Sequence, residues 1–385
     1  MEWGEFKLGD LFEIKHYGKQ RSQEDLQKDG ELKYNFVMQN ENNNGVIEKV
    51  PEQIGNHFNL IPGNSISAFT HLNKVYYQEE PFYSKQGSNV YTLRSNFLNK
   101  QIAKFVISAI NSVIGNLEYG KNTASRLVEY KIQLPIKNGQ MDFDFMESFI
   151  AELEAERIAE LEAYLLATGL KDYTLTAEER KALDDFENGI IEWAIFKIED
   201  LFEKLNLKNH NMLFDKLQDT SPTKTDEFNL PLVNAKFGDN GIMFYGREKD
   251  FDSAEMTIDI ISNGAIATGT VYAQPYKTGV LWDAYLLRPK VVDISKQKLL
   301  YLTASLEKSI KMKFGWDNKA VWSKVQYELI SLPVQNQQPD YSSMENLISA
   351  IQKLVIKEVV FYADSKSRVH KCSAIHQSVS SHKGI

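Results

Sequence analysis

Apolar residues recur at helical spacing in four stretches of the chain. Residues 97–115 and residues 297–312 each place apolar side chains three or four positions apart, which predicts two amphipathic helices of similar length. Residues 142–166 and residues 341–363 repeat this spacing for longer, in the pattern of a coiled-coil seam. We therefore expect two shorter and two longer helices, alternating along the chain.

The segments between these helices carry signals of strands and turns. Residues 86–95 alternate partly between polar and apolar side chains, which predicts a strand. Asn44-Gly45 and Asn240-Gly241 are typical of hairpin turns, because Asn and Gly tolerate positive φ. A capping box at Thr176–Glu179 predicts a short helix that Gly189 would end. The mixture of elements predicts an α+β fold.

The opening of the chain is repeated at its middle. Residues 2–13 read EWGEFKLGDLFE and residues 192–203 read EWAIFKIEDLFE, with eight of twelve positions identical at an offset of 190. A repeat period near half of the 385 residues indicates a duplicated domain, since solenoid repeats have periods of roughly 20–50 residues. Convergent use of Trp, Phe and Leu is the alternative explanation of this single match.

Further matches follow in the same order, which convergence does not explain. Asn44-Gly45 pairs with Asn240-Gly241, and a Val-Tyr-x-Gln segment followed by Pro and an aromatic residue occurs at 75–82 and again at 271–276. Leu-Pro steps and Asp-x-x-x-Met-Glu helix starts then recur in both halves, and the offset drifts to 198 as loop insertions would cause. We therefore predict two copies of one domain.

The long helices follow the two domains and carry their own predicted roles. Asp142 and Asp340 stand where N-caps would stand. The apolar seams either pack on each domain's own core or pack on each other as an antiparallel coiled coil, and we favour the second because the pattern outlasts one small domain. The seam residues predicted to bind partners are Met146, Ile150, Leu153, Leu161, Met344, Ile348, Ile351 and Val355.

These patterns divide the chain into five segments. We expect a first domain at 1–141, a long helix with a short linker helix at 142–191, a second domain at 192–338, and a second long helix at 339–364. Residues 365–385 are rich in Ser, His and Lys with little periodicity, which predicts a disordered tail.

Charge is unevenly distributed and changes how the net value of −8 is interpreted. Residues 142–191 hold 4 basic and 14 acidic residues, whereas each domain is close to neutral. A near-neutral domain can still bind DNA if its cations share one face. The single cysteine, Cys372, excludes an internal disulfide, and no apolar run is long enough to cross a membrane. Both observations predict a cytoplasmic protein.

Several kinds of catalytic motif are absent from the sequence. There is no Gly-x-x-x-x-Gly-Lys-Ser/Thr phosphate loop, no Asn/Asp-Pro-Pro-Tyr/Phe adenine-methyltransferase motif and no metal-ligand spacing of His, Asp or Glu. Asp142 and Asp144 are the nearest approach to a paired-carboxylate site, but their place at a helix start favours a capping role. We therefore expect no catalysis and no cofactor in this chain.

The repeated motifs together resemble the specificity subunits of type I restriction–modification systems, including BcgI-like specificity subunits. The doubled Trp-x-x-Phe-Lys opening, the Asn-Gly turn, the Val-Tyr-x-Gln segment, the Leu-Pro step and the long helix after each copy carry this resemblance over residues 1–363. It implies two target-recognition domains (mixed β-sheet with helices) separated by two long helices. Each domain would read one half of a bipartite site in double-stranded DNA.

The same resemblance implies partners for a non-catalytic subunit. The helices would bind DNA methyltransferase subunits, and a restriction or translocase subunit is a further expected partner. S-adenosylmethionine, Mg and ATP are expected on those partners rather than here, and a bacterial or archaeal cytoplasm is the expected setting. A tandem-domain scaffold that binds proteins rather than DNA is the alternative function.

Candidate DNA-binding residues are the polar and basic residues of loops that could reach base edges and phosphates. In the first domain they are Lys15, Lys19, Gln20, Arg21, Asn42, Asn43, Asn44, Lys121, Asn122, Ser125 and Arg126. In the second domain they are Lys208, Asn209, Lys236, Lys277, Trp316, Asn318, Lys319 and Lys324. Solvated surface charge is the alternative explanation for each of them, and the loops are more secure than the single residues.

Overall fold

The computed structural model describes residues 1–16, 23–55, 58–84, 90–115 and 124–381. The chain divides into two compact units, one made of Met1–Leu161 with Lys366–Ile385 and the other of Glu162–Ser365. Each unit contains both sheets and helices, so the predicted α+β class is confirmed.

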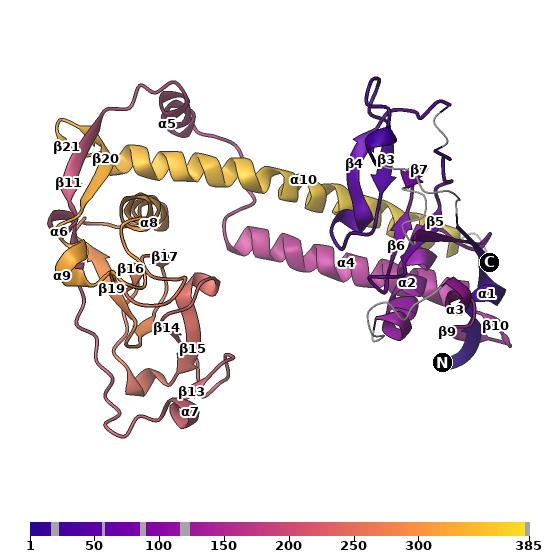
Figure 1. The fold of residues 1–385 in the computed structure, drawn as a ribbon, viewed down its shortest axis with the longest axis horizontal. Coiled ribbons are helices and arrows are strands. Elements are labelled where there is room, and N and C mark those ends of the chain that lie inside the picture. Colours follow the sequence, from indigo (N-terminus) through magenta and orange to yellow (C-terminus); the bar gives the residue numbers. More distant parts are fainter. Residues whose placement is uncertain (17–22, 56–57, 85–89, 116–123, 382–385) are drawn as a thin grey trace. The chain divides into compact units, whose positions relative to one another are not determined.

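The described residues of the first unit form three small sheets, in the strand orders β1-β9-β10, β2-β8-β5-β6 and β4-β3-β7. The strands β3, β4 and β7 of the last sheet are labelled in Figure 1. Its elements are β1 Glu2–Lys7, α1 Leu8–Leu11, β2 Glu13–Lys15, η1 Gln23–Asp25, β3 Tyr34–Val37, η2 Asn43–Gly45, β4 Val46–Val50, β5 Ser65–Phe69, β6 Lys74–Gln78, β7 Phe82–Ser84, β8 Val90–Arg94, α2 Lys100–Ile114, α3 Ala124–Leu127, β9 Lys131–Lys137, β10 Gln140–Met141 and α4 Phe143–Ala167. The strand predicted at 86–95 corresponds to β8, and its first residues lie outside the described ranges.

The second unit contains the sheets β11-β20-β21, β12-β19-β16-β17 and β13-β15-β14-β18. Its elements are α5 Ala177–Glu187, β11 Trp193–Lys197, α6 Ile198–Leu201, β12 Phe202–Lys204, α7 Lys216–Asp219, β13 Thr220–Ser221, β14 Leu230–Val233, η3 Asp239–Gly241, β15 Ile242–Gly246, η4 Glu248–Asp250, β16 Thr257–Ile261, β17 Val271–Gln274, β18 Gly279–Val280, β19 Ala284–Pro289, α8 Lys296–Ile310, α9 Trp322–Val325, β20 Leu329–Gln335, β21 Gln338–Pro339 and α10 Tyr341–Ser381.

The two domains share one topology, which confirms the internal duplication. The sheet β2-β8-β5-β6 corresponds strand for strand to β12-β19-β16-β17. In each domain the hairpin strand, β3 or β14, pairs antiparallel with the next strand and parallel with a later short strand, β7 or β18. The predicted Asn-Gly turns join the strands of these hairpins.

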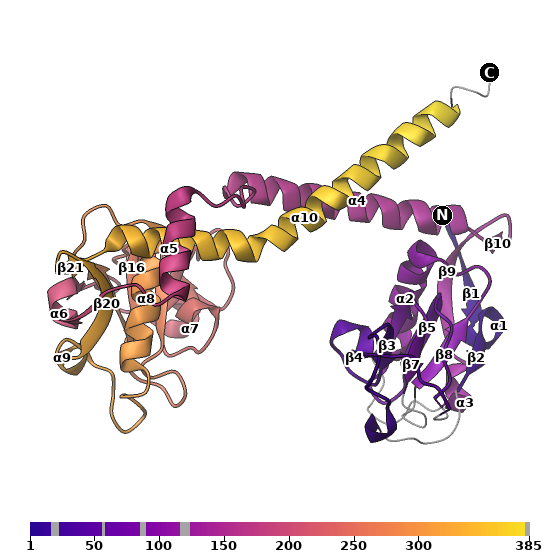
Figure 2. The ribbon, with the colours of Figure 1, turned by 90° about the horizontal axis from the view of Figure 1, so that it is seen from above.

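One helix covers a face of the sheet β2-β8-β5-β6 in the first domain and of the sheet β12-β19-β16-β17 in the second. α2 packs against β6 and β9, and its place beside β9 can be seen in Figure 2. It buries Ile102, Val106 and Ile110. α8 packs against β17 and β20 and buries Leu299 and Leu306 in the same manner. Each such side chain contributes roughly 1.5–3 kcal/mol on burial, so the helical spacing seen in the sequence marks the main cores.

The predicted helix caps are present. The Asp142 carboxylate accepts a hydrogen bond from the backbone N–H of Phe145 at 3.0 Å, and Asp340 accepts one from Ser343 at 2.9 Å. Thr176 and Glu179 form the reciprocal capping box of α5, and Gly189 follows that helix with φ +66°. The carboxyl oxygen of Asp142 caps the helix, which supports the predicted capping role over a paired-carboxylate site at Asp142 and Asp144.

The disordered tail predicted for residues 365–385 is wrong up to Ser381, because α10 continues to that residue. Residues 364–381 contain neither Gly nor Pro, so nothing in their sequence ends the helix that Tyr341 begins. The lack of apolar periodicity in this stretch indicated only that it has no apolar seam. Residues 382–385 lie outside the described part of the chain.

Three of the seam residues predicted to bind partners are buried, Met146 and Met344 completely and Ile150 with 8% of its surface exposed. Met146 and Met344 are fully buried in the first turns of α4 and α10, where each helix packs on the core of the domain before it. They are therefore wrong as partner-binding residues. Leu153, Ile351 and Val355 are exposed, and the packing of the two long helices on each other stays a prediction.

Candidate nucleic-acid interface

In the first domain, two of the predicted DNA-binding loops lie at one end of the four-stranded sheet. Lys15 ends β2 opposite Thr92, at the end of the sheet where Phe69 finishes β5. The loop after Phe69 contacts the hairpin loop 38–45, because the His71 N–H donates to Gln39 Oε1 at 3.1 Å. Lys15 and the Asn-rich hairpin loop are therefore displayed at the same end of the sheet.

The exposed polar residues of this hairpin loop are Glu41, Asn42, Asn43 and Asn44. Asn43 and Asn44 have φ values of 47° and 52°, in the left-handed region that Asn tolerates better than most residues. Their side chains face solvent, as residues that contact a ligand must.

Other candidates of the first domain are less well defined. Lys19, Gln20, Arg21, Lys121 and Asn122 lie outside the described residues. Ser125 falls within α3, but its side chain is not described, and Arg126 is exposed in the same short helix. DNA contact by these residues therefore stays a prediction.

In the second domain, the equivalent hairpin loop meets the loop after α8. The Lys311 ammonium, one residue beyond the end of α8, lies 5.8 Å from the ring centroid of Phe237 in the hairpin loop. Lys236 in the same loop forms an ion pair with Asp239 at 2.6 Å. The loop that carries Lys236 therefore contacts Lys311, where the loop that carries Trp316 begins.

The loop after α8 is held in shape by its own polar groups. Lys324 donates to the Asn318 side-chain oxygen at 2.8 Å, and Asn318 in turn donates to the carbonyl of Lys313 at 2.9 Å. Trp316 and Lys319 remain exposed on this loop. Two of the residues predicted to contact DNA, Asn318 and Lys324, are therefore hydrogen-bonded to each other.

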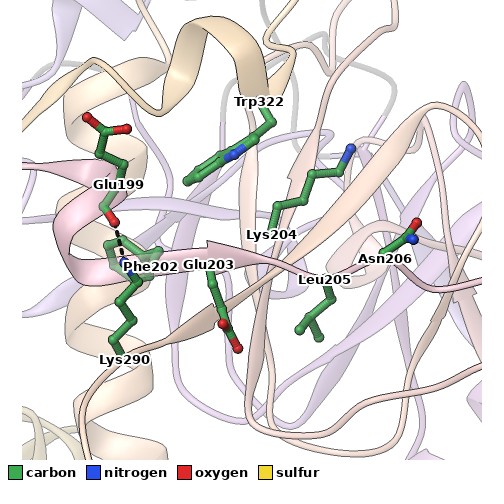
Figure 3. A pocket seen from close by; sticks show the side chains of 8 residues that line it. All are labelled: Glu199, Phe202, Glu203, Lys204, Leu205, Asn206, Lys290 and Trp322. Atoms are coloured by element: carbon green, nitrogen blue, oxygen red, sulfur yellow. Dashed lines mark hydrogen bonds between the residues drawn. The ribbon is translucent and has the colours of Figure 1, made fainter.

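This loop continues into α9, which lies against the edge strand of the sheet. Trp322, Lys204 and Asn206 line an open pocket of about 480 Å³ there (Figure 3). The Lys290 ammonium donates to the carbonyl of Glu199 at 2.6 Å at the far side of that pocket (Figure 3). Lys204 was missed by the sequence analysis, since it belongs to a strand rather than to a loop.

Lys277 does not join the other candidates of its domain. Its neighbour Tyr276 accepts a hydrogen bond from Lys296 at 3.1 Å, in the first turn of α8. Phe237 meets the opposite end of α8, about 22 Å away for a helix of fifteen residues. The loop that carries Lys277 therefore contacts the start of α8, whereas the hairpin loop contacts its end.

Lys208 and Asn209 form a third group. The backbone N–H of Lys208 donates to Asp252 at 3.0 Å, and Asn209 pairs with Phe251 in an isolated bridge. His210 contacts the same Asp252 carboxylate at 2.7 Å, and this contact is the main cause that lowers the pKa of Asp252. The contacts of Lys208, Asn209 and His210 with Phe251 and Asp252 therefore hold the loop after β12 in place.

Behind the hairpin loop of the second domain lies a carboxyl group with no counterpart in the first. Asp259 is fully buried in β16, and among the described residues neither of its carboxyl oxygens has a hydrogen-bond partner. Ser67 occupies the same place in β5, because the two face Tyr272 and Tyr76 in matching strand pairs. Burial raises the pKa of Asp259 well above its usual range.

This shift predicts a stability that falls with rising pH. Above its usual pKa of 3.8, Asp259 ionises in the unfolded chain but stays protonated in the folded one, so folding loses up to about 1.4 kcal/mol per pH unit. Asp259→Ser is expected to raise the midpoint of thermal unfolding more at pH 8 than at pH 5. Asp226→Ser, at an exposed carboxyl, is the control. An equal gain at both pH values would contradict the assignment of a buried neutral carboxyl.

Each domain also has an apolar groove beside the start of its long helix. In the first domain Trp3, Phe105 and Leu153 line a groove of about 740 Å³. In the second domain Trp193 and Ile351 stand at matching places in a groove of about 590 Å³. The repeated Trp of each opening is about half exposed here, 52% for Trp3 and 49% for Trp193, so these rings are open surface as well as framework.

The two grooves differ in what borders them. Phe186 of α5 lines the groove of the second domain, and Ala182 of the same helix is buried in the neighbouring core. The groove of the first domain has no such residue among those that line it. Exposed apolar grooves of this kind are typical of protein-binding surfaces.

Comparison with known proteins agrees with this duplicated architecture. A family model described as the type I restriction modification DNA specificity domain matches residues 1–163 and again residues 190–360. The chain belongs to this family. The two matched segments each contain one domain and the first part of the long helix that follows it, which is the unit that the internal repeat delimits.

Individual relatives are distant. The specificity subunit S.BcgI of a type II restriction enzyme from Heyndrickxia coagulans is 22% identical over 288 residues, which are 74% of this chain and 76% of that protein. The type I restriction–modification S subunit from M. genitalium has a similar fold, with a TM-score of 0.59 at 16% identity over 96% of this chain and 94% of that one.

No three His, Cys, Asp or Glu side chains gather in the described ranges as metal ligands would. None of the helices in that part of the chain has the length and apolar character needed to cross a bilayer.

Proposed function

We propose that each domain of this specificity subunit reads one half of a bipartite site in double-stranded DNA, and that the chain itself performs no catalysis. The observation that carries the proposal is one framework with two different sets of loops. The hairpin loops read MQNENNNG at 38–45 and NAKFGDNG at 234–241, and each joins two antiparallel strands, β3 with β4 and β14 with β15. Two readers of different half-sites need this combination.

The chemistry of the loops supports DNA as the ligand. Asn side chains can donate and accept at once, which suits base edges in the major groove, while Lys and Arg suit phosphates. The exposed Asn42–Asn44 in one domain and the loop residues Lys236, Trp316 and Lys319 in the other offer both kinds of contact. Different loop residues would select different base pairs.

The long helices would set the separation of the half-sites. α4 has 25 residues and is therefore about 38 Å long, close to the 34–36 Å of one turn of DNA. A spacer of this kind keeps the gap between two half-sites constant.

The partners are proposed to be DNA methyltransferase subunits, with a restriction or translocase subunit as a further one. Two apolar grooves at matching places, one in each domain, support the docking of two copies of one partner. Ile150 and Leu153 line one groove and Ile348 and Ile351 line the other, and all four stand in the predicted partner-binding seams. S-adenosylmethionine, Mg and ATP would be bound by those partners.

Exchange of one domain tests the proposal directly. Replacing residues 1–141 with the same domain of another family member, in cells that also express the methyltransferase partner, is expected to change one half of the methylated sequence. The other half and the spacing should stay the same, since residues 192–338 and both long helices are untouched. Sequencing of methylated bases across the genome measures both halves at once.

The reciprocal exchange of residues 192–338 is the matched control and should change only the other half-site. A change of both halves in either chimera, or of neither in two active chimeras, would contradict the division of labour.

A protein-binding scaffold is the alternative function, and the exposed apolar grooves favour it. It predicts no affinity for duplex DNA even at low salt. A DNA reader instead binds with an affinity that falls steeply as salt rises, because phosphate contacts release counterions. Titration of a labelled duplex at two salt concentrations separates the two functions.

A further inference from the structure

The repeated Val-Tyr-x-Gln segments hold the Asn-Gly loops in both domains. In the first domain Gln78 Nε2 donates to the backbone carbonyl of Asn44 at 2.9 Å. In the second domain Gln274 Nε2 donates to the carbonyl of Asn240 at 2.7 Å. Two motifs that lie more than thirty residues apart in the sequence thus meet through the same bond, twice in one chain.

The tyrosine of each segment makes a second contact with the same loop. The Tyr76 hydroxyl donates to the carbonyl of Glu41 at 3.2 Å. The Tyr272 hydroxyl accepts the backbone N–H of Gly238 at 2.8 Å. Each loop is therefore fastened at its turn and again two or three residues before it.

The glutamine contacts are sheltered from water. Gln78 is 4% exposed and Gln274 is 3% exposed, and Gln78 also donates to Ser67 Oγ at 3.0 Å. A buried amide that loses its partner keeps its desolvation cost, so each bond resists opening more than a surface bond would.

The glycine of each turn rests directly on the sheet. A Cβ on Gly45 would lie 2.3 Å from the Phe69 ring, and one on Gly241 would lie 2.6 Å from an Asp259 oxygen. Both glycines have positive φ, 81° and 74°. The turn is thus seated on the sheet face, while the side chain that precedes each glycine remains exposed.

We propose that Tyr76 with Gln78, and Tyr272 with Gln274, are positioning residues that fix one base-reading loop in each domain. The loops differ in sequence, but the pairs that hold them are the same, so Asn44 and Asn240 are presented from equivalent places. An Asn amide matches the donor and acceptor of an adenine edge in the major groove. This inference rests on the proposed function and adds the residues that determine how sharply each half-site is read.

The test uses the full chain with its methyltransferase partner and a library of bipartite duplexes. Gln78→Met keeps the side-chain volume but removes the donor, and is expected to lower discrimination about tenfold at one half-site only. Gln274→Met is expected to do the same at the other half-site. A purely structural role would instead lower affinity without changing the base preference of one half.

Tyr76→Phe and Tyr77→Phe form a matched pair within one strand. Each removes a single hydroxyl, but Tyr77 bonds Asn64 Oδ1 at 2.9 Å rather than the loop. Only Tyr76→Phe should weaken discrimination, and it should do so at the half-site that Gln78→Met affects.

Two outcomes would overturn the inference: wild-type discrimination in Gln78→Met and Tyr76→Phe, or equal losses at both half-sites in either one. If the wild-type complex reads no bipartite DNA at all, the proposed function itself fails, which is a different result from wild-type reading that the variants leave intact.

Discussion

Gly45→Ala is expected to release the hairpin loop of the first domain from its sheet. A non-glycine residue at φ 81° costs about 1–2 kcal/mol, and the clash with the Phe69 ring adds about 1–3 kcal/mol. The Met38 N–H donates to the Gly45 carbonyl, so its amide proton should then exchange faster with deuterated water. Hydrogen exchange of residues 38–45 measures this loss, and reading of one half-site should fall with it.

Gly139→Ala is the matched control. Gly139 has φ 77° but no atom within 4 Å of its Cβ position, so it reports the cost of positive φ alone. Gly241→Ala should fall between the two, because its nearest neighbour is the end of the Asp259 side chain rather than a ring packed in the core. Equal effects of all three substitutions would show that the turn is not seated on the sheet.

Glu179→Ala is expected to detach the linker helix α5 from α10. Glu179 is 5% exposed and accepts hydrogen bonds from Ser349 Oγ, from the Lys353 ammonium at 2.9 Å and from the Thr176 N–H at 2.8 Å. Removing one partner of a buried ion pair costs about 3–5 kcal/mol. Hydrogen exchange of the α5 amides should report a loss of protection of this size.

The hydrogen bonds that Glu179 accepts from Ser349 and Lys353 also make the packing of α5 on α10 depend on pH. Burial alone would raise the pKa of Glu179, but the bonds from Ser349 and Lys353 outweigh burial and lower it from 4.5. A lowered folded pKa means that this stabilisation is complete above pH 4.5 and is lost as the pH falls further.

The control for Glu179→Ala is Glu187→Ala, at the exposed last residue of α5. Equal protection in both variants would contradict the role of Glu179.

Much of the fold could be predicted because it depends on local patterns. The spacing of Ile102, Val106 and Ile110 marks a helix wherever it packs. An aspartate before a helix caps it when its carboxylate accepts a hydrogen bond from a backbone N–H only three residues on. The duplication was visible because both copies must bury the same positions. The end of α10 could not be predicted in this way, since a polar helix without Gly or Pro has no signal that separates it from a polar coil.

The candidate site was less predictable than the fold. Loop residues such as Asn42–Asn44 were found because exposed polar residues next to Gly mark turns. Lys277 was predicted on a loop of its own, and only the structure shows that this loop contacts the start of α8 while the hairpin loop contacts its end. Lys204 was missed because only the packing of α9 on the edge strand makes it part of a pocket.

The sequence by itself determined that this protein has two copies of one domain, which elements each copy contains and which residues cap them. These properties depend on neighbours a few positions away or on an order of motifs that repeats. Only the tertiary structure decided that the Gln of Val-Tyr-x-Gln bonds the Asn-Gly turn, that Asp259 is buried without a partner and that Met146 faces its own core. Such contacts join residues far apart in the chain, and their energies depend on distance and burial, which the order of residues does not contain.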